Sequence, residues 1–393
     1  MNIDFKVQQI TLDKLFKMSP ITIGGSFVMM MIVGFLFYNI VPIYVILFGL
    51  LMHMIVLIYR AAICKSYSKY KAKITDLYIL KKYKRYYVLG TFMSGIVWGL
   101  SVVLLFFEDS IEYQFFLYTV VVGLAGASVV TLSAVFQVYI AFIVPMLGIS
   151  AIYAFMQEGD IYTATGIFIS GLIVFFYISG RSYYRNLVDS IVDKESVLNT
   201  QHEVINRLSK AGEYRDNETG MHITRMSYSC SLLAKECGYS EDFATNILYA
   251  SGMHDIGKIG IPDNILLKPE KLDANERAIM QEHVNIGKKI LENSNSNLIK
   301  LSESIAYTHH EKYDGTGYPN SLKASDIPIE GRITAICDVF DALVSERPYK
   351  KAWSHQDAID YITEESSKHF DPELVKKFVL IYPDIKNFYD KHA

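Results

Sequence analysis

The C-terminal half of the sequence holds short clusters of histidines and carboxylates whose side chains could bind metal ions. A lone histidine is usually packed or solvated, but so many ionisable groups would be costly to bury without partners. Imidazole and carboxylate without thiolate favour a first-row metal such as Fe or Mn over structural zinc. Because one ion does not need so many ligands, we expect two or three metal ions. The candidate ligands are Glu218, His222, His254, Asp255, His283, His309, His310 and Asp338.

Paired metal ions of this kind are typical of enzymes that cleave phosphoesters. They clamp both oxygens of a displacement at phosphorus, and they generate hydroxide from bound water at neutral pH. The residue types alone therefore predict hydrolysis of a phosphodiester. They say nothing about which base the substrate carries.

The spacing of these residues indicates how they could be brought together. Glu218 and His222 are four residues apart, which is one turn on one face of a helix. His254 and Asp255 are adjacent in "GMHDIGK", near the end of an apolar helical segment. Residues 309–319, "HHEKYDGTGYP", join two ligands to a tight turn that its glycines permit.

Several blocks of the sequence resemble the signature blocks of the HD-GYP phosphodiesterases, a subgroup of the HD metal-hydrolase superfamily. They are "HDIGKIGIPDNILLKPEKL", "HHEKYDGTGYP" and "ICDVFDALVSERPYKKA", supported by "EYRDNETGMHITRMS" and "HFDPELVKKF". The resemblance covers about residues 212–382. It implies that the substrate is cyclic di-GMP, opened to linear pGpG and in some members cut further to GMP.

The resemblance also implies roles for individual residues. The eight candidate ligands would bind the metal ions, with Asp255 as the carboxylate that bridges two metals and their shared hydroxide. Glu218 would help to hold a third metal, since family members with Glu at this place look able to do so.

Other residues would contact the substrate or orient a ligand. Lys258 would contact a phosphate oxygen or protonate the leaving oxygen, and Tyr318 would face the substrate. Arg347 and Lys350 resemble the family's phosphate-contacting pair, because a guanidinium fork suits phosphate geometry. The alternative for these two is a solvated helix end. Asp341, one turn after Asp338, would orient a metal ligand.

The elements that position these residues are predicted to be helices. From residue 211 to residue 393, long periodic segments alternate with short turns and strand-like alternation is nearly absent, so we expect an all-α HD-GYP domain. The formal net charge of −3 gives no sign of a nucleic-acid partner.

Residues 21–180 differ in composition and predict an integral membrane module of six helices. A spanning helix needs about 20 mostly apolar residues. Such a module resembles the six-helix membrane input modules found at the N-termini of bacterial sensor proteins. The expected spans are 21–38, 41–59, 87–107, 115–135, 138–155 and 162–178, after a cytoplasmic segment over 1–20.

The charges of the loops predict the orientation of this module in the inner membrane. Nine Lys and Arg between residues 60 and 85 separate the second span from the third, whereas the loops "EDSIEY" and "QEGD" are acidic. Because basic loops stay inside, the N-terminus and the C-terminal half are expected in the cytoplasm. Within the spans, Gly95 and Gly99 favour close helix packing inside one chain over a dimer contact. His53 is a polar group inside a span, which makes it a candidate for a functional role; the alternative is that it is simply packed there.

Residues 181–210 are predicted to form a helical linker with a coiled-coil pattern. Residues 182–210 contain no Pro or Gly, and most seam positions are apolar, which indicates a parallel homodimer. The alternative is a single amphipathic helix packed on the next domain. The seam positions are Leu187, Ile191, Lys194, Leu198, Gln201, Ile205 and Leu208.

Three other functions compete with a membrane-bound cyclic di-GMP phosphodiesterase. One is a receptor that binds the dinucleotide without cutting it. Another is an HD hydrolase that acts on another cyclic dinucleotide. The third, a transporter with a regulatory domain, is disfavoured because few charges lie within the spans.

Overall fold

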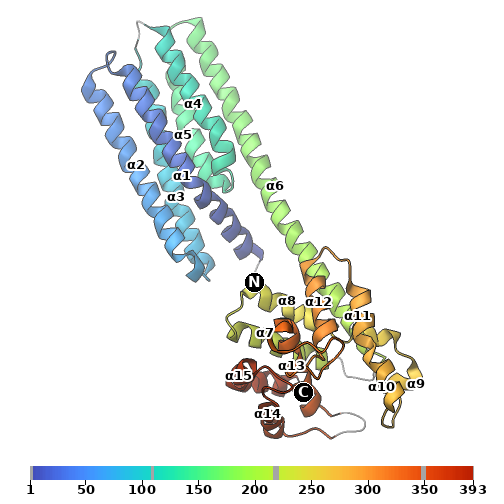
Figure 1. Cartoon of the computed structure of the whole chain (residues 1–393). Helices are drawn as coiled ribbons and strands as arrows, with labels where there is room; N and C mark the ends of the chain where they lie inside the picture. Colours follow the sequence, from blue (N-terminus) through green and yellow to red (C-terminus); the bar gives the residue numbers. More distant parts are fainter. Residues whose placement is uncertain (1–2, 108–109, 216–220, 347–350, 393) are drawn as a thin grey trace. The chain divides into compact units, whose positions relative to one another are not determined.

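The computed structural model describes residues 3–107, 110–215, 221–346 and 351–392. The chain separates into two compact units, residues 1–196 and 197–393, each of which is described by itself. The described residues form helices and no named strand, with one isolated bridge between Ser366 and Phe370 (Figure 1). The predicted all-α fold is confirmed.

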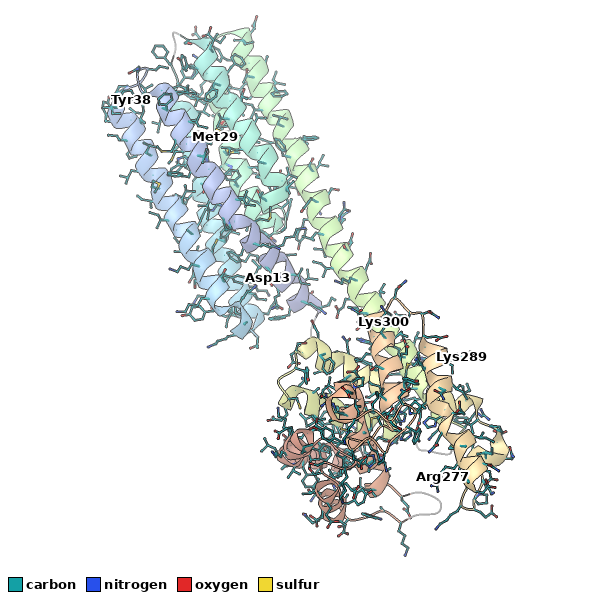
Figure 2. All side chains as sticks on the ribbon, in the orientation of Figure 1. Asp13, Met29, Tyr38, Arg277, Lys289 and Lys300 are labelled. Carbon is teal, nitrogen blue, oxygen red and sulfur yellow. The ribbon has the colours of Figure 1, made fainter. Side chains whose placement is uncertain are left out.

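The first unit contains the helices predicted to span a membrane. Within the described residues, six helices are long and apolar enough to cross a bilayer, which confirms the expected number and indicates a multi-pass membrane protein. Many apolar side chains project outward from these helices (Figure 2), and Phe35 is 82% exposed. The helices are α1 Ile3–Phe37, α2 Ile43–Tyr70, α3 Leu77–Leu104, α4 Ile111–Leu132, α5 Phe136–Phe155 and α6 Asp160–Glu213, with the short η1 Lys71–Lys73 after α2.

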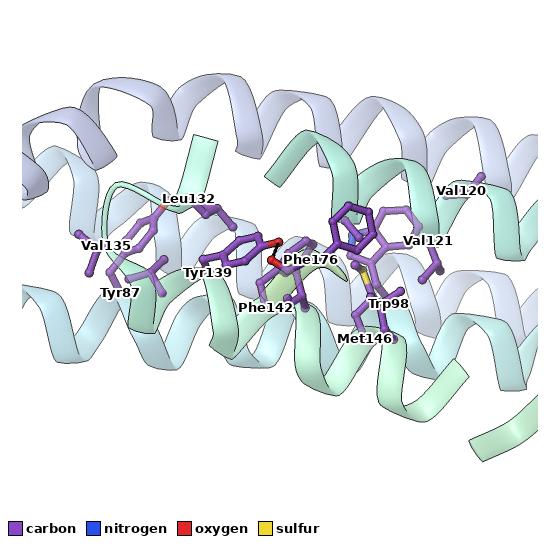
Figure 3. Close-up of a cluster of buried hydrophobic side chains, with 14 of the residues drawn as sticks. Tyr87, Trp98, Val120, Val121, Leu132, Val135, Tyr139, Phe142, Met146 and Phe176 are labelled. Carbon is purple, nitrogen blue, oxygen red and sulfur yellow. Dashed lines mark hydrogen bonds between the residues drawn. The ribbon is translucent and has the colours of Figure 1, made fainter. Parts of the chain in front are cut away.

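Glycines allow α3 and α5 to pack closely inside this unit. A Cβ on Gly95 would collide with the carbonyl oxygen of Phe142, and one on Gly99 would crowd Ile149. The structure thus agrees with the expectation that this glycine pair serves packing within one chain. Figure 3 shows the neighbouring cluster, in which the Tyr139 hydroxyl donates a hydrogen bond of 2.9 Å to the Phe176 carbonyl.

One basic residue of the first unit lies elsewhere than the sequence suggested. Arg60 was counted with the basic loop, but it lies within α2 and is 2% exposed. Its guanidinium donates hydrogen bonds to the hydroxyls of Thr22, Tyr87 and Ser94 at 3.0, 3.0 and 3.3 Å. Arg60 therefore ties α2 to α1 and α3, and the orienting loop charge comes from the residues that follow it.

The sixth span and the predicted linker form one continuous helix, α6. The boundary between the two compact units falls after Ser196, inside this helix. In the second unit, Ile205 is buried in the core and His202 stacks on Tyr249 at 3.8 Å. Leu198 and Leu208 are 38% and 46% exposed. The last turns of α6 therefore pack on their own domain, while other seam positions stay accessible.

The helices of the second unit enclose one main hydrophobic core, and a small separate cluster is formed by Ile261, Ile265 and Leu266. Local capping fixes several helix starts: Asp273 and Glu276 form a reciprocal capping box on α10, and Asp371 caps α15 ahead of Pro372. The helices are α7 Met221–Glu236, α8 Glu241–Ala250, α9 Asp263–Leu266, α10 Ala274–Gln281, α11 His283–Leu291, α12 Asn297–Thr308, α13 Ile329–Val344, α14 His355–Glu364 and α15 Pro372–Lys391, with the short turns η2 Ser251–Met253, η3 Ile256–Gly260 and η4 Ala324–Asp326.

Candidate metal centre

The candidate ligands converge from five separate places in the second unit. Glu218 lies outside the described residues, so its position is a prediction still. Most of the others lie at helix ends or in turns: His222 at the start of α7, His254 and Asp255 between η2 and η3, His283 at the start of α11, and His309 and His310 at the end of α12. Asp338 lies inside α13.

These residues form two groups that could each hold a metal ion. One group contains Asp255, His283, His309 and His310, and the other contains His222, His254 and Asp338. Within each group, one ligand atom from every residue lies within 4.8 Å of the others. The two His/Asp groups are the kind of metal site that the sequence predicted.

Asp255 lies between the two groups. Its Oδ2 is 3.1 Å from Nε2 of His254, whereas its Oδ1 is 3.4 Å from Nε2 of His283 and 3.7 Å from Nε2 of His309. Each carboxylate oxygen therefore faces a different group. This arrangement suits a carboxylate that bridges two ions.

Three of the imidazoles are held with one nitrogen turned toward the site. Each uses Nδ1 to bond a backbone carbonyl, which leaves Nε2 with a free lone pair. Those Nε2 atoms, together with Oδ1 of Asp255, are buried and have no hydrogen-bond partner. Metal ions would satisfy them, so the residues present fit metal binding. The bonds are His254 to Ser251 (3.0 Å), His283 to Met280 (2.8 Å) and His309 to Ile305 (3.0 Å).

His222 is oriented by a buried carboxylate instead. Its Nδ1 is 2.7 Å from Oδ2 of Asp341, and its Nε2 is 3.5 Å from Oδ1 of Asp338. Arg225 donates to both oxygens of Asp341, at 2.8 and 3.1 Å. Burial would raise the pKa of Asp341, but the hydrogen bonds from His222 and Arg225 lower it to about 2. The sequence indicated the role of Asp341 and missed that of Arg225.

Charge and burial set the protonation of the site. Burial would raise the pKa of Asp255, but Lys258 and His254 outweigh it and hold that pKa well below its usual range. Burial lowers the pKa of His283 to about 4, and it lowers that of His310 as well. Burial would also lower the pKa of His254, but the charges of Asp255 and Asp338 outweigh it and raise that pKa to about 10, so this imidazole has to lose a proton before it binds a metal. A carboxylate and neutral imidazoles are the forms that bind metals.

The loop after His310 is held in place by a ring contact and by hydrogen bonds from its backbone to Glu311. The Tyr318 ring stacks on His310 at 4.9 Å. Glu311, which the sequence reading did not single out, is 1% exposed and accepts hydrogen bonds from the backbone N–H groups of Asn320 and Leu322. A Cβ on Gly317 would collide with the backbone of Glu311 and its neighbour, so only glycine fits there.

A pocket opens over the metal centre. Asp255, Lys258, His310 and Asp338 form its polar side, and α13 supplies an apolar side. Lys258 Nζ is 2.8 Å from Oδ2 of Asp255, so an ammonium group lies at the Asp255 carboxylate. The two other predicted phosphate contacts, Arg347 and Lys350, lie outside the described residues.

Gly257 is expected to tolerate no side chain. Its Cβ would collide with the backbone of His283 and Gly287, so Gly257→Ala should separate η3 from α11 and pull His283 away from Asp255 within the first ligand group. We expect a loss of about 1–3 kcal/mol of stability, with lower metal content and turnover. Gly260→Ala is the matched control, since its Cβ meets only the flexible Ile286 side chain. Equal metal content in the two purified variants would contradict the prediction.

His369 should make the second unit sensitive to acid. Burial, aided by the charge of Lys312, lowers the pKa of His369 to about 4. Below the ordinary histidine pKa of about 6.5, the unfolded chain binds a proton that the folded one refuses. This contribution to stability is therefore complete above pH 6.5 and is lost as the pH falls toward 4. Thermal unfolding of wild type and His369→Gln should converge over that interval; a constant difference would refute the prediction.

The all-helical fold and the two His/Asp groups define an HD-type metal centre, and comparison with known proteins agrees. The model of the HD domain family matches residues 195–374. A 3'3'-cGAMP-specific phosphodiesterase 2 of Vibrio cholerae is 49% identical over 177 residues, which is 45% of this chain and 34% of that protein.

Two further relatives match the same half of the chain. A cyclic di-GMP phosphodiesterase of Thermotoga maritima is 46% identical over 187 residues, covering 48% of this chain and 51% of that protein. The cyclic di-GMP phosphodiesterase response regulator RpfG of Xanthomonas campestris is 45% identical over 175 residues, covering 44% and 46%. The chain thus spans about half or less of the length of these relatives. Its C-terminal half is an HD domain of the HD-GYP family.

Proposed function

We propose that this chain is a membrane-bound, metal-dependent phosphodiesterase that hydrolyses cyclic di-GMP to pGpG, to GMP or to both. The observation that carries the proposal is Asp255, whose two oxygens face the two groups of candidate ligands. Bound metal ions, Fe or Mn by the chemistry of the ligands, would supply Lewis acidity and activate water.

The side chains around the pocket support this chemistry. The backbone carbonyls that bond Nδ1 of His254, His283 and His309 keep Nε2 turned into the site, so little reorganisation would be needed for these side chains to hold metal ions. The Lys258 ammonium faces the pocket, where it can contact a phosphate oxygen or donate a proton to the leaving oxygen. Tyr318, stacked on His310, offers a ring against which a base could stack.

The first test is turnover by the full-length protein, purified in detergent and reconstituted with Fe(II) or Mn(II). We expect two or three metal ions per chain and linear product from cyclic di-GMP. Bound dinucleotide without cleavage under both metals would favour a receptor instead. Protein that takes up no metal would refute the site itself.

A second candidate substrate is 3'3'-cGAMP. The observation that favours it is the Vibrio cholerae relative, which is named as specific for that dinucleotide and is 49% identical over the matched region. Measuring kcat/KM for both dinucleotides with one preparation decides between them. If kcat/KM for 3'3'-cGAMP exceeds that for cyclic di-GMP by more than about tenfold, or about 1.4 kcal/mol, 3'3'-cGAMP becomes the proposed substrate in place of cyclic di-GMP.

We also propose that the N-terminus and the HD domain lie on the cytoplasmic side of the inner membrane. Exposed lysines around η1, including Lys65, Lys69 and Lys71, support this orientation through the positive-inside rule. A membrane-impermeant maleimide should label Glu158→Cys in intact cells and Ser68→Cys only after permeabilisation. The opposite labelling would reverse the topology.

A homodimer through residues 182–210 completes the proposal. Leu198 lies on the heptad seam and is 38% exposed, which leaves it accessible to a second copy. Leu198→Cys should form a disulfide-linked dimer under mild oxidation in membranes. Asp193→Cys, which is exposed and off the seam, is the matched control. Equal cross-linking of the two variants would argue against a specific coiled coil.

A further inference from the structure

A strongly basic surface lies where α2 ends and α3 begins. Residues 65–85 contain eight Lys and Arg against one Asp, and all of these cations except Lys84 are exposed. Within the described part of the chain, Lys65, Lys82 and Arg85 form no salt bridge. This end of the membrane unit therefore carries positive charge that the described carboxylates do not neutralise.

Two carboxylates lie at this end of the unit, and both are already engaged. Asp76 accepts a hydrogen bond of 2.8 Å from the backbone N–H of Tyr78 and caps α3. Asp13 accepts a hydrogen bond of 3.0 Å from the Tyr67 hydroxyl and lies 4.0 Å from the Lys71 ammonium. Among the described residues, Lys71 is the one cation of residues 65–85 with a carboxylate that close. The surface thus suits an anion supplied from outside the chain.

The lengths of the two helices place Lys65 and Lys82 at the height of lipid headgroups. At about 1.5 Å per residue, α2 rises about 33 Å from its first residue to Lys65, and α3 rises the same distance from Lys82 to its last residue. The hydrocarbon core is about 30 Å thick, and a helix tilt of about 20° leaves a rise of about 31 Å. The hydrogen-bonded hydroxyls of Ser66 and Tyr83 are 3.0 Å apart, so the two positions are level with each other.

Exposed tyrosines lie beside these cations. Tyr59 and Tyr86 are 37% and 46% exposed, and the Tyr59 hydroxyl donates a hydrogen bond of 3.3 Å to the Tyr86 carbonyl. The Lys82 ammonium lies over the Tyr86 ring, 5.9 Å from its centre. Tyrosine is enriched where membrane and water meet, because its ring is apolar and its hydroxyl is polar. Rings and ammonium groups together therefore indicate contact with the headgroup layer rather than with bulk water.

We propose that the ends of α2 and α3 that meet at η1 bind anionic phospholipids through a basic collar formed by Lys65, Lys82 and Arg85, which recognises the lipid phosphate. The ammonium groups attract phosphate as point charges, and the guanidinium can bond it through a planar fork. The positive-inside rule explains how such charges orient a chain during insertion, but it does not require that they hold a particular lipid afterwards. Lipid binding at the collar is separate from the metal centre, so its test needs no turnover.

Spin-labelled lipids measure this binding on the full-length protein. The protein is reconstituted in dioleoylphosphatidylcholine bilayers with a trace of phosphatidylglycerol or phosphatidylcholine that carries a nitroxide near the end of one acyl chain. The two probes differ only in the headgroup. Electron paramagnetic resonance gives the fraction of each probe that the protein immobilises, and hence the ratio of their association constants. Spectra are recorded in about 0.01 M and about 1 M NaCl, between which the Debye length falls from about 30 Å to about 3 Å.

Two sets of substitutions locate the binding. The first removes the collar and consists of Lys65→Gln, Lys82→Gln and Arg85→Gln together. The matched control removes three exposed cations of the second unit and changes the net charge by the same amount; it consists of Lys271→Gln, Lys289→Gln and Lys300→Gln. Should the triple collar variant fail to fold, Lys82→Gln alone is compared with Lys289→Gln alone.

In low salt, we expect phosphatidylglycerol to associate at least about threefold more strongly than phosphatidylcholine, and we expect the ratio to fall toward one in high salt. The collar variant should lose at least about half of this preference, whereas the control variant should keep it. A ratio near one in low salt, or a ratio that salt does not change, would mean that these charges only orient the chain, and the proposal would be wrong. Equal losses in the two variants would also overturn it, because net charge rather than the collar would then attract the lipid.

Discussion

Asp255→Asn should abolish turnover and release metal, while leaving the fold intact. The amide keeps the size of the side chain but loses the negative charge, so it can no longer face both ligand groups as a bridging carboxylate. Removing even one preorganised electrostatic group from an active site costs about 10²–10³ in rate. Because we propose that this residue bridges two ions, we expect a loss of at least about 10³-fold.

The measurement is metal content by mass spectrometry together with turnover of cyclic di-GMP and 3'3'-cGAMP by the full-length protein. Asp326→Asn, at an exposed position of the same domain, is the control and should keep both metal and activity. An Asp255→Asn protein that retained its metal ions and more than about a tenth of wild-type turnover would rule out the bridging role, since that is a loss of only ~1.4 kcal/mol in transition-state binding.

The candidate ligand histidines could be picked out from the sequence because several of them lie in adjacent pairs. His254 with Asp255 and His309 with His310 are adjacent pairs, and adjacent ligands mark a metal site before any fold is known. Arg225 lies three residues after His222, and that spacing on one helix face was a usable signal. Its partner, however, is 116 residues away on α13, so only the fold reveals the pair.

Other features depend on tertiary packing that residue patterns do not contain. Glu311 directly follows His309 and His310, and its carboxylate could in principle bind a metal. Instead, this carboxylate accepts hydrogen bonds from the backbone N–H groups of Asn320 and Leu322 in the loop that follows. In the membrane half, lipid imposes length and apolarity on each span, so the number of spans was predictable. The burial of Arg60 could not be predicted, because the hydroxyl groups that accept its hydrogen bonds come from α1 and α3. Charge counts cannot distinguish a buried helix residue from a loop residue.

The largest expected loss of stability comes from Asp341→Ala. Asp341 is fully buried and accepts hydrogen bonds from Arg225 and Ser345, while His222 bonds to the same carboxylate. Removing it leaves the Arg225 guanidinium buried without its counter-charge, which costs about 3–5 kcal/mol. Urea unfolding followed by Trp353 fluorescence in a Trp98→Phe background reports this loss for the second unit. Asp384→Ala, at an exposed position on α15, should change stability by less than about 0.5 kcal/mol.

A double variant separates the charge penalty from the positioning of His222. Arg225→Met with Asp341→Leu removes both buried charges, so most of the lost stability should return. Metal affinity should stay about 10–100-fold below wild type, because His222 Nδ1 still lacks the acceptor that holds its ring. If stability and metal affinity recover together, Asp341 acts only as a counter-ion to Arg225. If stability recovers and affinity does not, Asp341 positions the ligand, and the buried arginine is present to keep that carboxylate ionised.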